Sequence, residues 1–363
     1  MPGGVNLPDV PPARPSDDSI GYAIVGLGGY ALKQIMPRIG QAKRSHIAAL
    51  VSGNPEKMAQ VGDAYGVPSA SRYSYEDFDR IADDPGIDAV YIVLPSGLHC
   101  DYTERAFAAG KHVLCEKPMA LSSAECDRMI AAARRADKKL MIAYRCHFEP
   151  YNLEAMRLTS ENALGDLRLI RTQQAYRMGP TTPAQNWRVS ARYAGGGPLE
   201  DYGIYGLQAA LYLSGEMPTS VSAATFRPAN DARFAEIFAK DSAQLNFPSG
   251  LSAHISTSYD STGKNNVPAY GTMAALDMDP AIGYGGHVMT LRRGRDEEIL
   301  TPGDPEVQFA RQLDHLADAI RDGIPIRVPG EMGRRDVRLI EAIHAAAQQG
   351  RTIALNPDGT MRG

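Results

Sequence analysis

The stretch at residues 21–31, GYAIVGLGGYA, constrains the fold of this chain more than any other. An apolar run leads directly into two glycines and the expected start of a helix, which is the strand, turn and helix context of a G-x-G-x-x-A loop. Gly26 permits a tight turn, Gly28 lets the backbone approach a pyrophosphate, and the helix N-terminus supplies N–H groups to phosphates. The stretch predicts a dinucleotide-binding loop, although glycine turns of this kind also occur without a ligand. The predicted contacts are Gly26, Gly28, Gly29 and Tyr30.

Strands and helices alternate from residue 21 onward, which indicates a parallel sheet with crossover helices. Strands are expected at residues 22–25, 46–52, 68–70, 89–95, 112–115 and 139–143, and an amphipathic helix at residues 123–136. We therefore predict an α/β Rossmann domain, a doubly wound parallel sheet, at residues 20–145.

The pattern becomes β-rich after Gly165. Strands are expected at residues 167–176, 220–226, 235–247, 251–259, 273–278 and 288–292, with a hairpin turn at FPSG, residues 247–250. Helices at residues 307–322 and 333–349 each end at a glycine. Residues 146–363 are thus predicted to form an α+β domain with a large, mostly antiparallel open sheet that binds substrate. Because a half-exposed apolar sheet of this size needs covering, we also expect it to form homo-dimers or homo-tetramers.

Residues 1–19 contain five prolines and two glycines and no apolar period, which predicts an extended N-terminal arm. The alternative is a disordered leader.

Composition and net charge restrict the kinds of partner that this chain can bind. Hydrophobic residues make up 44% of the 363 and charged residues 22%, as in soluble globular proteins, and a formal net charge of -4 provides no basic field for nucleic acid. No apolar run approaches the roughly 20 residues of a membrane span. We expect small-molecule partners and a cytoplasmic location, or a periplasmic one if an export signal has been removed. The four cysteines have no metal-site spacing and are expected to be buried free thiols; no metal is predicted.

The ribose end of the dinucleotide site favours NADP over NAD. An NAD-binding strand commonly ends in an acid, but this one ends Leu-Val-Ser-Gly-Asn. Ser52 and Asn54 can donate hydrogen bonds, the backbone at Gly53 is open, and Lys57 is a cation for a 2′-phosphate. The alternative is a plain turn with a solvated lysine. Arg72 is a second phosphate contact or a surface arginine.

Two further stretches carry chemical groups. In Cys-Glu-Lys-Pro, residues 115–118, Lys117 follows a parallel strand at its carboxyl end, where open α/β sheets bind ligands. In GGGPLEDYGIY, residues 195–205, a glycine-rich turn enters a helix on which Asp201 and Tyr205 are four apart and share one face. Together they can supply a cation, a carboxylate and a phenol to one small substrate.

The glycine loop, Glu116-Lys117-Pro118 and the GGG-x-L-x-D-x-G-x-Y run resemble the glucose-fructose oxidoreductase, inositol dehydrogenase and rhizopine catabolism (Gfo/Idh/MocA) family. The resemblance extends from Gly21 to about Leu355. Within the family, GLGGYA, SGNPEK and Tyr205 make the chain most similar to the glucose-fructose and aldose-aldose oxidoreductases.

The resemblance implies an NADP-dependent sugar oxidoreductase. Lys117 would hydrogen-bond the reacting oxygen, Asp201 would orient the sugar, and Tyr205 would pass the proton. An aldose would be oxidised at C1 to its lactone, and a second sugar would take the hydride and become an alditol. An ordinary NADP-dependent aldose 1-dehydrogenase and a noncatalytic sugar or dinucleotide sensor are the alternatives, and Tyr205 taken alone could equally be a packing residue.

The resemblance implies further cofactor contacts, which follow later strands or lie in a loop near the nicotinamide. These contacts are Leu94, Pro95, His99, Glu116, Lys117, Arg145, Trp187 and Arg188. His99 could equally cap a helix, and Trp187 could pack in the core.

The resemblance also implies that the N-terminal arm covers the cofactor of a neighbouring subunit.

Overall fold

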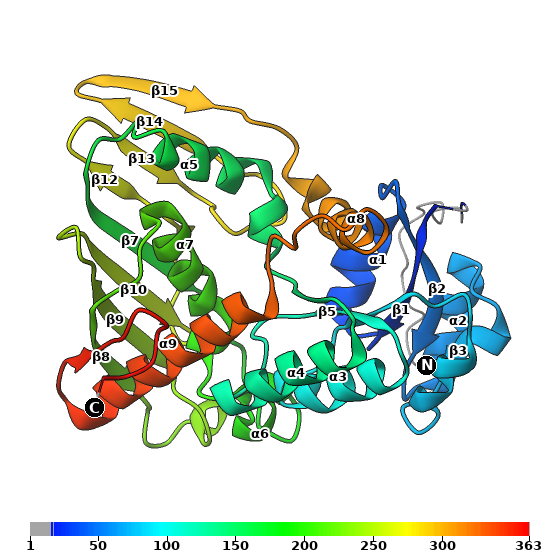
Figure 1. Cartoon of the computed structure of the whole chain (residues 1–363). Coiled ribbons are helices and arrows are strands. Elements are labelled where there is room, and N and C mark those ends of the chain that lie inside the picture. Colours follow the sequence, from blue (N-terminus) through cyan, green and yellow to red (C-terminus); the bar gives the residue numbers. More distant parts are fainter. Residues whose placement is uncertain (1–15, 17, 363) are drawn as a thin grey trace. The chain divides into compact units, whose positions relative to one another are not determined.

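The computed structural model describes residues 16 and 18–362, which form two compact units (Figure 1). The first unit contains the described residues up to Ala120, together with Ala124–Phe148 and Glu306–Gly333. The second contains Leu121–Ser123, Glu149–Pro305 and the residues from Arg334 onward. The predicted arm lies outside the described residues, except for Ser16, Asp18 and Ser19.

The first unit holds a parallel sheet of the predicted doubly wound type. Its strand order is β3-β2-β1-β4-β5-β6, so the order reverses at β1 and β4, which are neighbours. The expected strand at residues 68–70 is instead a 3-10 turn, Ser69–Ser71, and the strand follows it. The strands are β1 (Ile20–Val25), β2 (Ser45–Val51), β3 (Arg72–Tyr73), β4 (Ala89–Ile92), β5 (His112–Cys115) and β6 (Leu140–Ile142).

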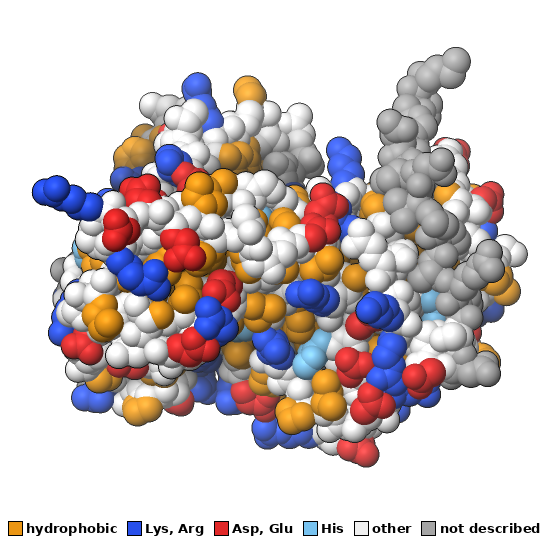
Figure 2. All heavy atoms as spheres, turned by 90° about the horizontal axis from the view of Figure 1, so that it is seen from above, with side chains coloured by type: hydrophobic (Ala, Val, Ile, Leu, Met, Phe, Trp, Pro, Cys, Tyr) orange, Lys and Arg blue, Asp and Glu red, His pale blue; other side chains and the backbone are white. Residues whose placement is uncertain are grey.

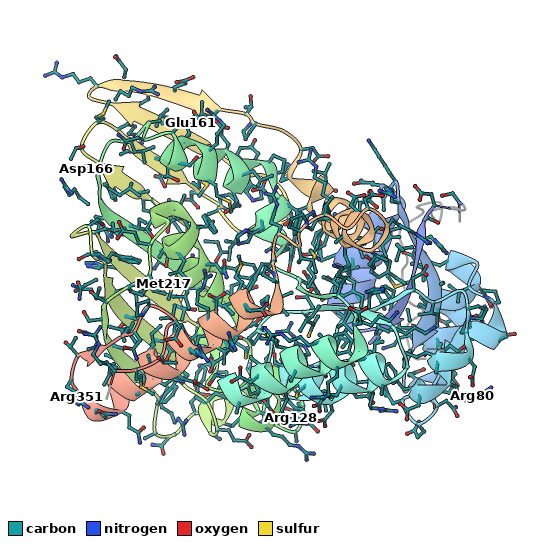
Figure 3. All side chains as sticks on the ribbon, in the orientation of Figure 1. Arg80, Arg128, Glu161, Asp166, Met217 and Arg351 are labelled. Atoms are coloured by element: carbon teal, nitrogen blue, oxygen red, sulfur yellow. The ribbon has the colours of Figure 1, made fainter. Side chains whose placement is uncertain are left out.

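Helices cover both faces of this sheet. Helix α1 (Met36–Ile39) and α8 (Gln308–Arg321) lie side by side (Figure 1), and α2 (Pro55–Tyr65) follows β2. An ion pair between Glu104 and Arg128 joins α3 (His99–Ala108) to α4 (Ser123–Ala136). The Arg128 side chain points outward in Figure 3. Residues 306–333 were predicted within the second domain, at residues 146–363, but they belong to the first unit. The reason is packing: α8 buries its apolar face there, and the buried Tyr22 hydroxyl donates to the Leu313 carbonyl at 2.8 Å.

The second unit contains the predicted large sheet, ordered β15-β14-β13-β12-β7-β10-β9-β8-β16, with β11 beside β7. Strands β7 and β10 pair in parallel, whereas the other pairs described in this sheet are antiparallel. The predicted hairpin joins β9 to β10. The strands are β7 (Leu167–Ala175), β8 (Ser220–Phe226), β9 (Lys240–Asn246), β10 (Ser252–Ser258), β11 (Asn265–Asn266), β12 (Ala269–Gly271), β13 (Ala275–Met278), β14 (Met289–Arg293), β15 (Asp296–Leu300) and β16 (Ile353–Ala354).

One face of this sheet packs on helices. These are α5 (Pro150–Ser160), α7 (Ile204–Ser214) and the part of α9 (Gly330–Gln349) from Arg334 onward; the short α6 (Ala191–Ala194) precedes the glycine turn (Figure 1). On the other face a groove of about 730 Å³ is lined by Gln173, Gln244 and His254 among others. This open face is therefore largely polar, which corrects the apolar premise of the oligomer prediction. Oligomerisation through the sheet stays a prediction.

The surface agrees with the composition. On the face seen in Figure 2, basic and acidic side chains are interspersed and no basic stripe stands out. Among the described helices, none combines the length and the apolar character that crossing a membrane requires. All four cysteines are buried and free, as predicted.

Candidate functional site

The glycine loop after β1 has the conformation that the motif requires. Gly26 has a φ of +101°, and a Cβ there would lie 2.4 Å from the Val93 carbonyl oxygen, so only glycine fits. A Cβ at Gly28 or Gly29 would meet no atom within 4 Å. The backbone of Gly28 and Gly29 is therefore open to a ligand, next to a helical segment that begins with a π-helical turn at Ala31–Ile35. These features fit the phosphates of a dinucleotide.

The residues expected at the ribose build the N-terminus of α2. The Asn54 side chain accepts from the Lys57 backbone N–H at 2.8 Å, and Ser52 Oγ accepts from the Asn54 N–H at 3.2 Å. Lys57 Nζ lies 3.4 Å from the Leu27 carbonyl, in the glycine loop itself. A helix N-terminus and an ammonium thus stand beside the loop, which fits the extra phosphate of NADP.

Arg72 has other partners in this structure. Its guanidinium donates to Asp63 at 2.7 Å and to the Val67 carbonyl at 2.9 Å. A Cβ at Gly62 would lie 2.2 Å from Arg72 Nε, so the side chain is packed against α2. The phosphate contact of Arg72 stays a prediction, and these partners favour the alternative of a structural surface arginine. Tyr75 was not predicted at this site, but its ring lies beside the turn after β2: a Cβ at Gly53 would be 3.1 Å from it.

His99 holds two loops of the sheet's carboxyl edge together. Its Nδ1 lies 2.9 Å from the Pro118 carbonyl oxygen and its Nε2 lies 2.9 Å from that of Leu94. The side chain is buried, and burial lowers the pKa of the imidazole. The neutral ring donates to one of these two carbonyls, and both of its nitrogens face backbone. The predicted contact of His99 with the nicotinamide stays a prediction. The side chain links the loop that contains Leu94 and Pro95 to the turn after Lys117.

Glu116 anchors the backbone of Lys117. The Tyr91 hydroxyl donates to Glu116 Oε1 at 2.7 Å, and Gln312 Nε2 donates to that hydroxyl at 3.2 Å. The Lys117 backbone N–H lies 3.3 Å from Glu116 Oε2. Burial raises the pKa of Glu116. The glutamate is thus part of the wall that fixes Lys117 at the end of β5, where its side chain is only partly buried.

Arg145 is buried at the end of β6. Its Nη1 donates to Gln308 Oε1 at 2.6 Å, which ties the end of β6 to the start of α8. Sequence reasoning missed Gln308 because it lies far from Arg145 along the chain.

In the second unit, Asp201 and Tyr205 lie in one helical segment, but its first turn is not α-helical. Leu199–Gly203 forms a π-helical turn and α7 begins only at Ile204. A Cβ at Gly203 would lie 2.9 Å from Thr257, and one at Gly206 would lie 2.3 Å from Thr172. The two glycines therefore let the segment approach β10 and β7 closely. Tyr205 is buried, with 7% of its surface exposed.

The Asp201 carboxylate is held from two sides. The Tyr259 hydroxyl donates to Asp201 Oδ2 at 2.6 Å, and Arg188 Nε donates to the same oxygen at 3.2 Å. Burial, with the Asp201 charge second, raises the pKa of Tyr259 well above its usual range, so Tyr259 stays a neutral donor. The Arg188 guanidinium also stacks on the Trp187 ring at 4.5 Å. The structure thus brings Trp187 and Arg188 to Asp201; their predicted contact with the cofactor stays a prediction.

Tyr259 was not predicted as a site residue, and the pairing of two strands explains its position. Tyr176 and Tyr259 follow β7 and β10, whose parallel register pairs Ala175 with Ser258. Their rings lie 5.1 Å apart, and Tyr202 lies 5.2 Å from Tyr176. Both tyrosines stand at the ends of strands predicted from the sequence, at residues 167–176 and 251–259. The sequence did not show that these two strands pair with each other, so it did not bring the tyrosines together.

Tyr259→Phe tests this support of Asp201. The variant removes one hydroxyl and keeps the ring, so the hydrogen bond to a charged group is lost, a change worth about 1.5–3 kcal/mol. If Asp201 orients a sugar, as the resemblance implies, KM for the sugar should rise roughly tenfold while kcat changes less. Steady-state kinetics with varied sugar measures both constants. An unchanged KM would mean that Asp201 does not need this donor.

No cluster of three or more His, Cys, Asp or Glu side chains suited to a metal ion occurs among the described residues.

Comparison with known proteins identifies both halves of the chain. Residues 20–144 match a family model described as "Oxidoreductase family, NAD-binding Rossmann fold", and residues 152–277 match "GFO/IDH/MocA C-terminal domain". Among solved structures, aldose-aldose oxidoreductase from Caulobacter crescentus, complexed with glycerol, is 45% identical with a TM-score of 0.90, and the match covers 93% of this chain and 100% of that one.

Two further relatives extend the picture. A D-xylose 1-dehydrogenase [NADP(+)] from Haloarcula marismortui is 27% identical over 360 residues, which cover 98% of this chain and 99% of that protein. A 3-ketoreductase from Actinomadura kijaniata in complex with NADP and TDP-benzene is 23% identical with a TM-score of 0.80, over 90% of this chain and 98% of that one. The latter supports the fold alone. The chain belongs to the Gfo/Idh/MocA oxidoreductase family.

Proposed function

We propose that this chain oxidises an aldose at C1 to the aldonolactone and then reduces a second sugar, an aldose or a ketose, to an alditol with the same bound NADP(H). The observation that carries the proposal is the Asp201 carboxylate, held by Tyr259 and Arg188 in the helical segment that contains Tyr205. The likeness to an aldose-aldose oxidoreductase supports the two-sugar reaction, and that to a xylose dehydrogenase supports an aldose substrate.

Each residue has a chemical role in this reaction. NADP supplies the acceptor for the hydride that leaves the sugar carbon. Asp201 accepts hydrogen bonds from sugar hydroxyls and fixes the orientation of the ring. Lys117 donates to the reacting oxygen and stabilises the negative charge that develops there. Tyr205 takes the hydroxyl proton and returns it in the reductive half-reaction. A phenol with an ordinary pKa near 10 needs a cation beside it for that task, and Lys117 is the residue that we propose for it.

NADP is the cofactor that both the residues and the relatives support. Gly28, Gly29 and the N-terminus of α2 fit the phosphates, and Lys57 beside the loop provides the charge for the 2′-phosphate. Relatives named for NADP include the xylose dehydrogenase above.

Lys57→Gln tests the choice of cofactor. The substitution removes the cation but keeps a side chain of similar length at an exposed turn of α2, so a charge-assisted contact worth about 1.5–3 kcal/mol is lost. We expect affinity for NADP to fall by about tenfold or more and affinity for NAD to change little. Fluorescence titration of both dinucleotides measures this. Equal losses for NADP and NAD would contradict the assignment.

Absorbance of the purified protein tests the whole proposal. Without added cofactor, an aldose should generate near-ultraviolet NADPH absorbance, and a subsequent acceptor sugar should remove it. If turnover instead requires stoichiometric free NADP, the chain is an ordinary aldose 1-dehydrogenase. If sugars bind without any change in absorbance in the presence of NADP, the chain is a sensor on the same fold.

A further inference from the structure

Three titratable side chains gather behind the turn that carries Asp201. Glu200 lies in the π-helical turn, Asp241 on β9 and His344 on α9. His344 Nδ1 is 3.8 Å from Glu200 Oε1, and His344 Nε2 is 3.9 Å from Asp241 Oδ1. The Glu200 side chain is 10% exposed and that of Asp241 only 1%. All three belong to the second unit, and none of them serves the proposed reaction directly.

The carboxyl groups of this cluster have too few partners to be buried as charges. Glu200 Oε1 accepts from the Gly196 N–H at 2.7 Å. Glu200 Oε2, both oxygens of Asp241 and His344 Nε2 make no hydrogen bond of ordinary geometry, although the backbone at Gly197 and Leu199 favours the ionised carboxylates. Two ionised carboxylates in such a place would lose more hydration than these few groups replace and would repel one another. The chemical alternative is that the cluster retains protons.

The titration behaviour follows from burial. Burial raises the pKa of Glu200 to about 7. Burial, with the Glu200 charge second, raises the pKa of Asp241 to about 7, although His344 works in the opposite direction. Burial lowers the pKa of His344. The cluster is therefore protonated on its carboxyls below neutrality and loses protons as the pH rises through about 7. Asp201 is the further charged group that acts on Glu200.

The glycine turn rests directly on these side chains. A Cβ at Gly196 would lie 2.4 Å from His344 Cε1 and 2.8 Å from Glu200 Oε1, so any other residue at 196 would displace one of these side chains. The Gly196 carbonyl accepts from the Phe238 N–H at 2.8 Å, and the Phe238 ring lies 5.6 Å from that of His344. A displacement of Glu200 therefore moves the turn, and Asp201 is the next residue along the chain.

We propose that Glu200, Asp241 and His344 form a buried proton-holding cluster and that Glu200 is a positioning residue for Asp201. While the carboxyls hold protons, Glu200 closes the turn through Gly196 and Asp201 stays in register with Tyr259 and Arg188. When a second carboxyl ionises, repulsion between Glu200 and Asp241 opens the turn and Asp201 moves. Sugar affinity then falls as pH rises through neutrality, while the hydride transfer step itself is less affected. The link to sugar affinity rests on the proposed function, whereas the cluster itself does not.

The fluorescence of Trp187, measured against pH, tests the cluster independently of enzyme activity. Trp187 is the single tryptophan of the chain and stacks on Arg188, which pairs with Asp201. Between about pH 6 and about pH 8.5 the wild-type emission should titrate with a midpoint near 7. Glu200→Gln keeps an acceptor for the Gly196 N–H but cannot ionise, so its emission should stay flat across this range. Asp241→Asn should do the same and guards against a folding defect in the first variant. Parallel curves for wild type and both variants would overturn the proposal.

Kinetics tests the positioning role. For wild type, KM for D-glucose should rise roughly fivefold above neutrality with a smaller change in kcat, and Glu200→Gln should remove the rise. Glu200→Ala, which lacks the acceptor, should raise KM at every pH, and rescue by glutamine separates positioning from simple packing. The control is Glu161→Gln, an exposed carboxylate at the end of α5 (Figure 3), which should follow wild type. Identical KM profiles for wild type and Glu200→Gln would overturn the positioning role. Absence of turnover in all proteins, with the fluorescence titration intact, would instead reject the proposed function.

Discussion

Lys117→Met is expected to lower kcat/KM for aldose oxidation by about a hundredfold to a thousandfold, the usual cost of removing a donor that stabilises a developing oxyanion. Methionine keeps the length of the stem and removes only the charge. The backbone should stay in place, because Glu116 and Tyr91 hold it from the buried side. Steady-state kinetics gives kcat/KM, and fluorescence titration shows whether NADP still binds.

An exposed lysine of the second unit provides the control for this variant. Lys240 is exposed at the start of β9, and Lys240→Met should retain wild-type kinetics. Unchanged turnover in Lys117→Met would reject the catalytic assignment of Lys117 and would mean that another group stabilises the reacting oxygen.

Tyr205→Phe is expected to reduce kcat by about a hundredfold to ten-thousandfold, since a positioned acid–base group contributes that much. The substitution removes one oxygen from a ring that is already buried, so packing around α7 is preserved. The pH–rate profile should also lose the limb that reports the base, because no phenol remains to titrate. Measurement of kcat across pH with saturating sugar and NADP checks both effects.

Tyr212→Phe, a tyrosine-to-phenylalanine change on the same helix α7, is the control that separates loss of the proton-transfer group from loss of a structural hydrogen bond. Tyr212 donates to Asn152 Oδ1 at 2.5 Å and links α7 to α5. Tyr212→Phe should lower the free energy of unfolding by about 1 kcal/mol and leave kcat within a factor of two or so. If Tyr205→Phe behaves like Tyr212→Phe, then Tyr205 packs the helix and another group transfers the proton.

The dinucleotide half was predictable because its signals are local. Gly26 occupies a conformation that only glycine accepts, and Asn54 caps the helix that it precedes. The parallel strands followed from βα alternation, which restricts topology strongly. The partners of some side chains in this half could not be predicted, because they are distant along the chain or are backbone groups. Arg72 donates to Asp63, and His99 faces two backbone carbonyls.

The second unit was harder to predict because its site depends on long-range pairing. The segment of Asp201 and Tyr205 was recognisable, but the partners of Asp201 were not. Tyr259 reaches it only because β7 and β10 pair in parallel, and strands β8 and β9 and helix α7 lie between them along the chain. Short or charged strands such as β15 and β16 lack the alternation that marks a strand in sequence, so they were missed.

The sequence by itself determined the dinucleotide loop, the parallel sheet and the preference for NADP, because each depends on neighbours along the chain. Only the tertiary structure decided what those residues contact. It placed α8 with the first unit, gave Asp201 its two donors, and gathered Glu200, Asp241 and His344 from a turn, a strand and a helix. Burial then set the protonation of that cluster, and burial is a property of the packed molecule that no single segment possesses.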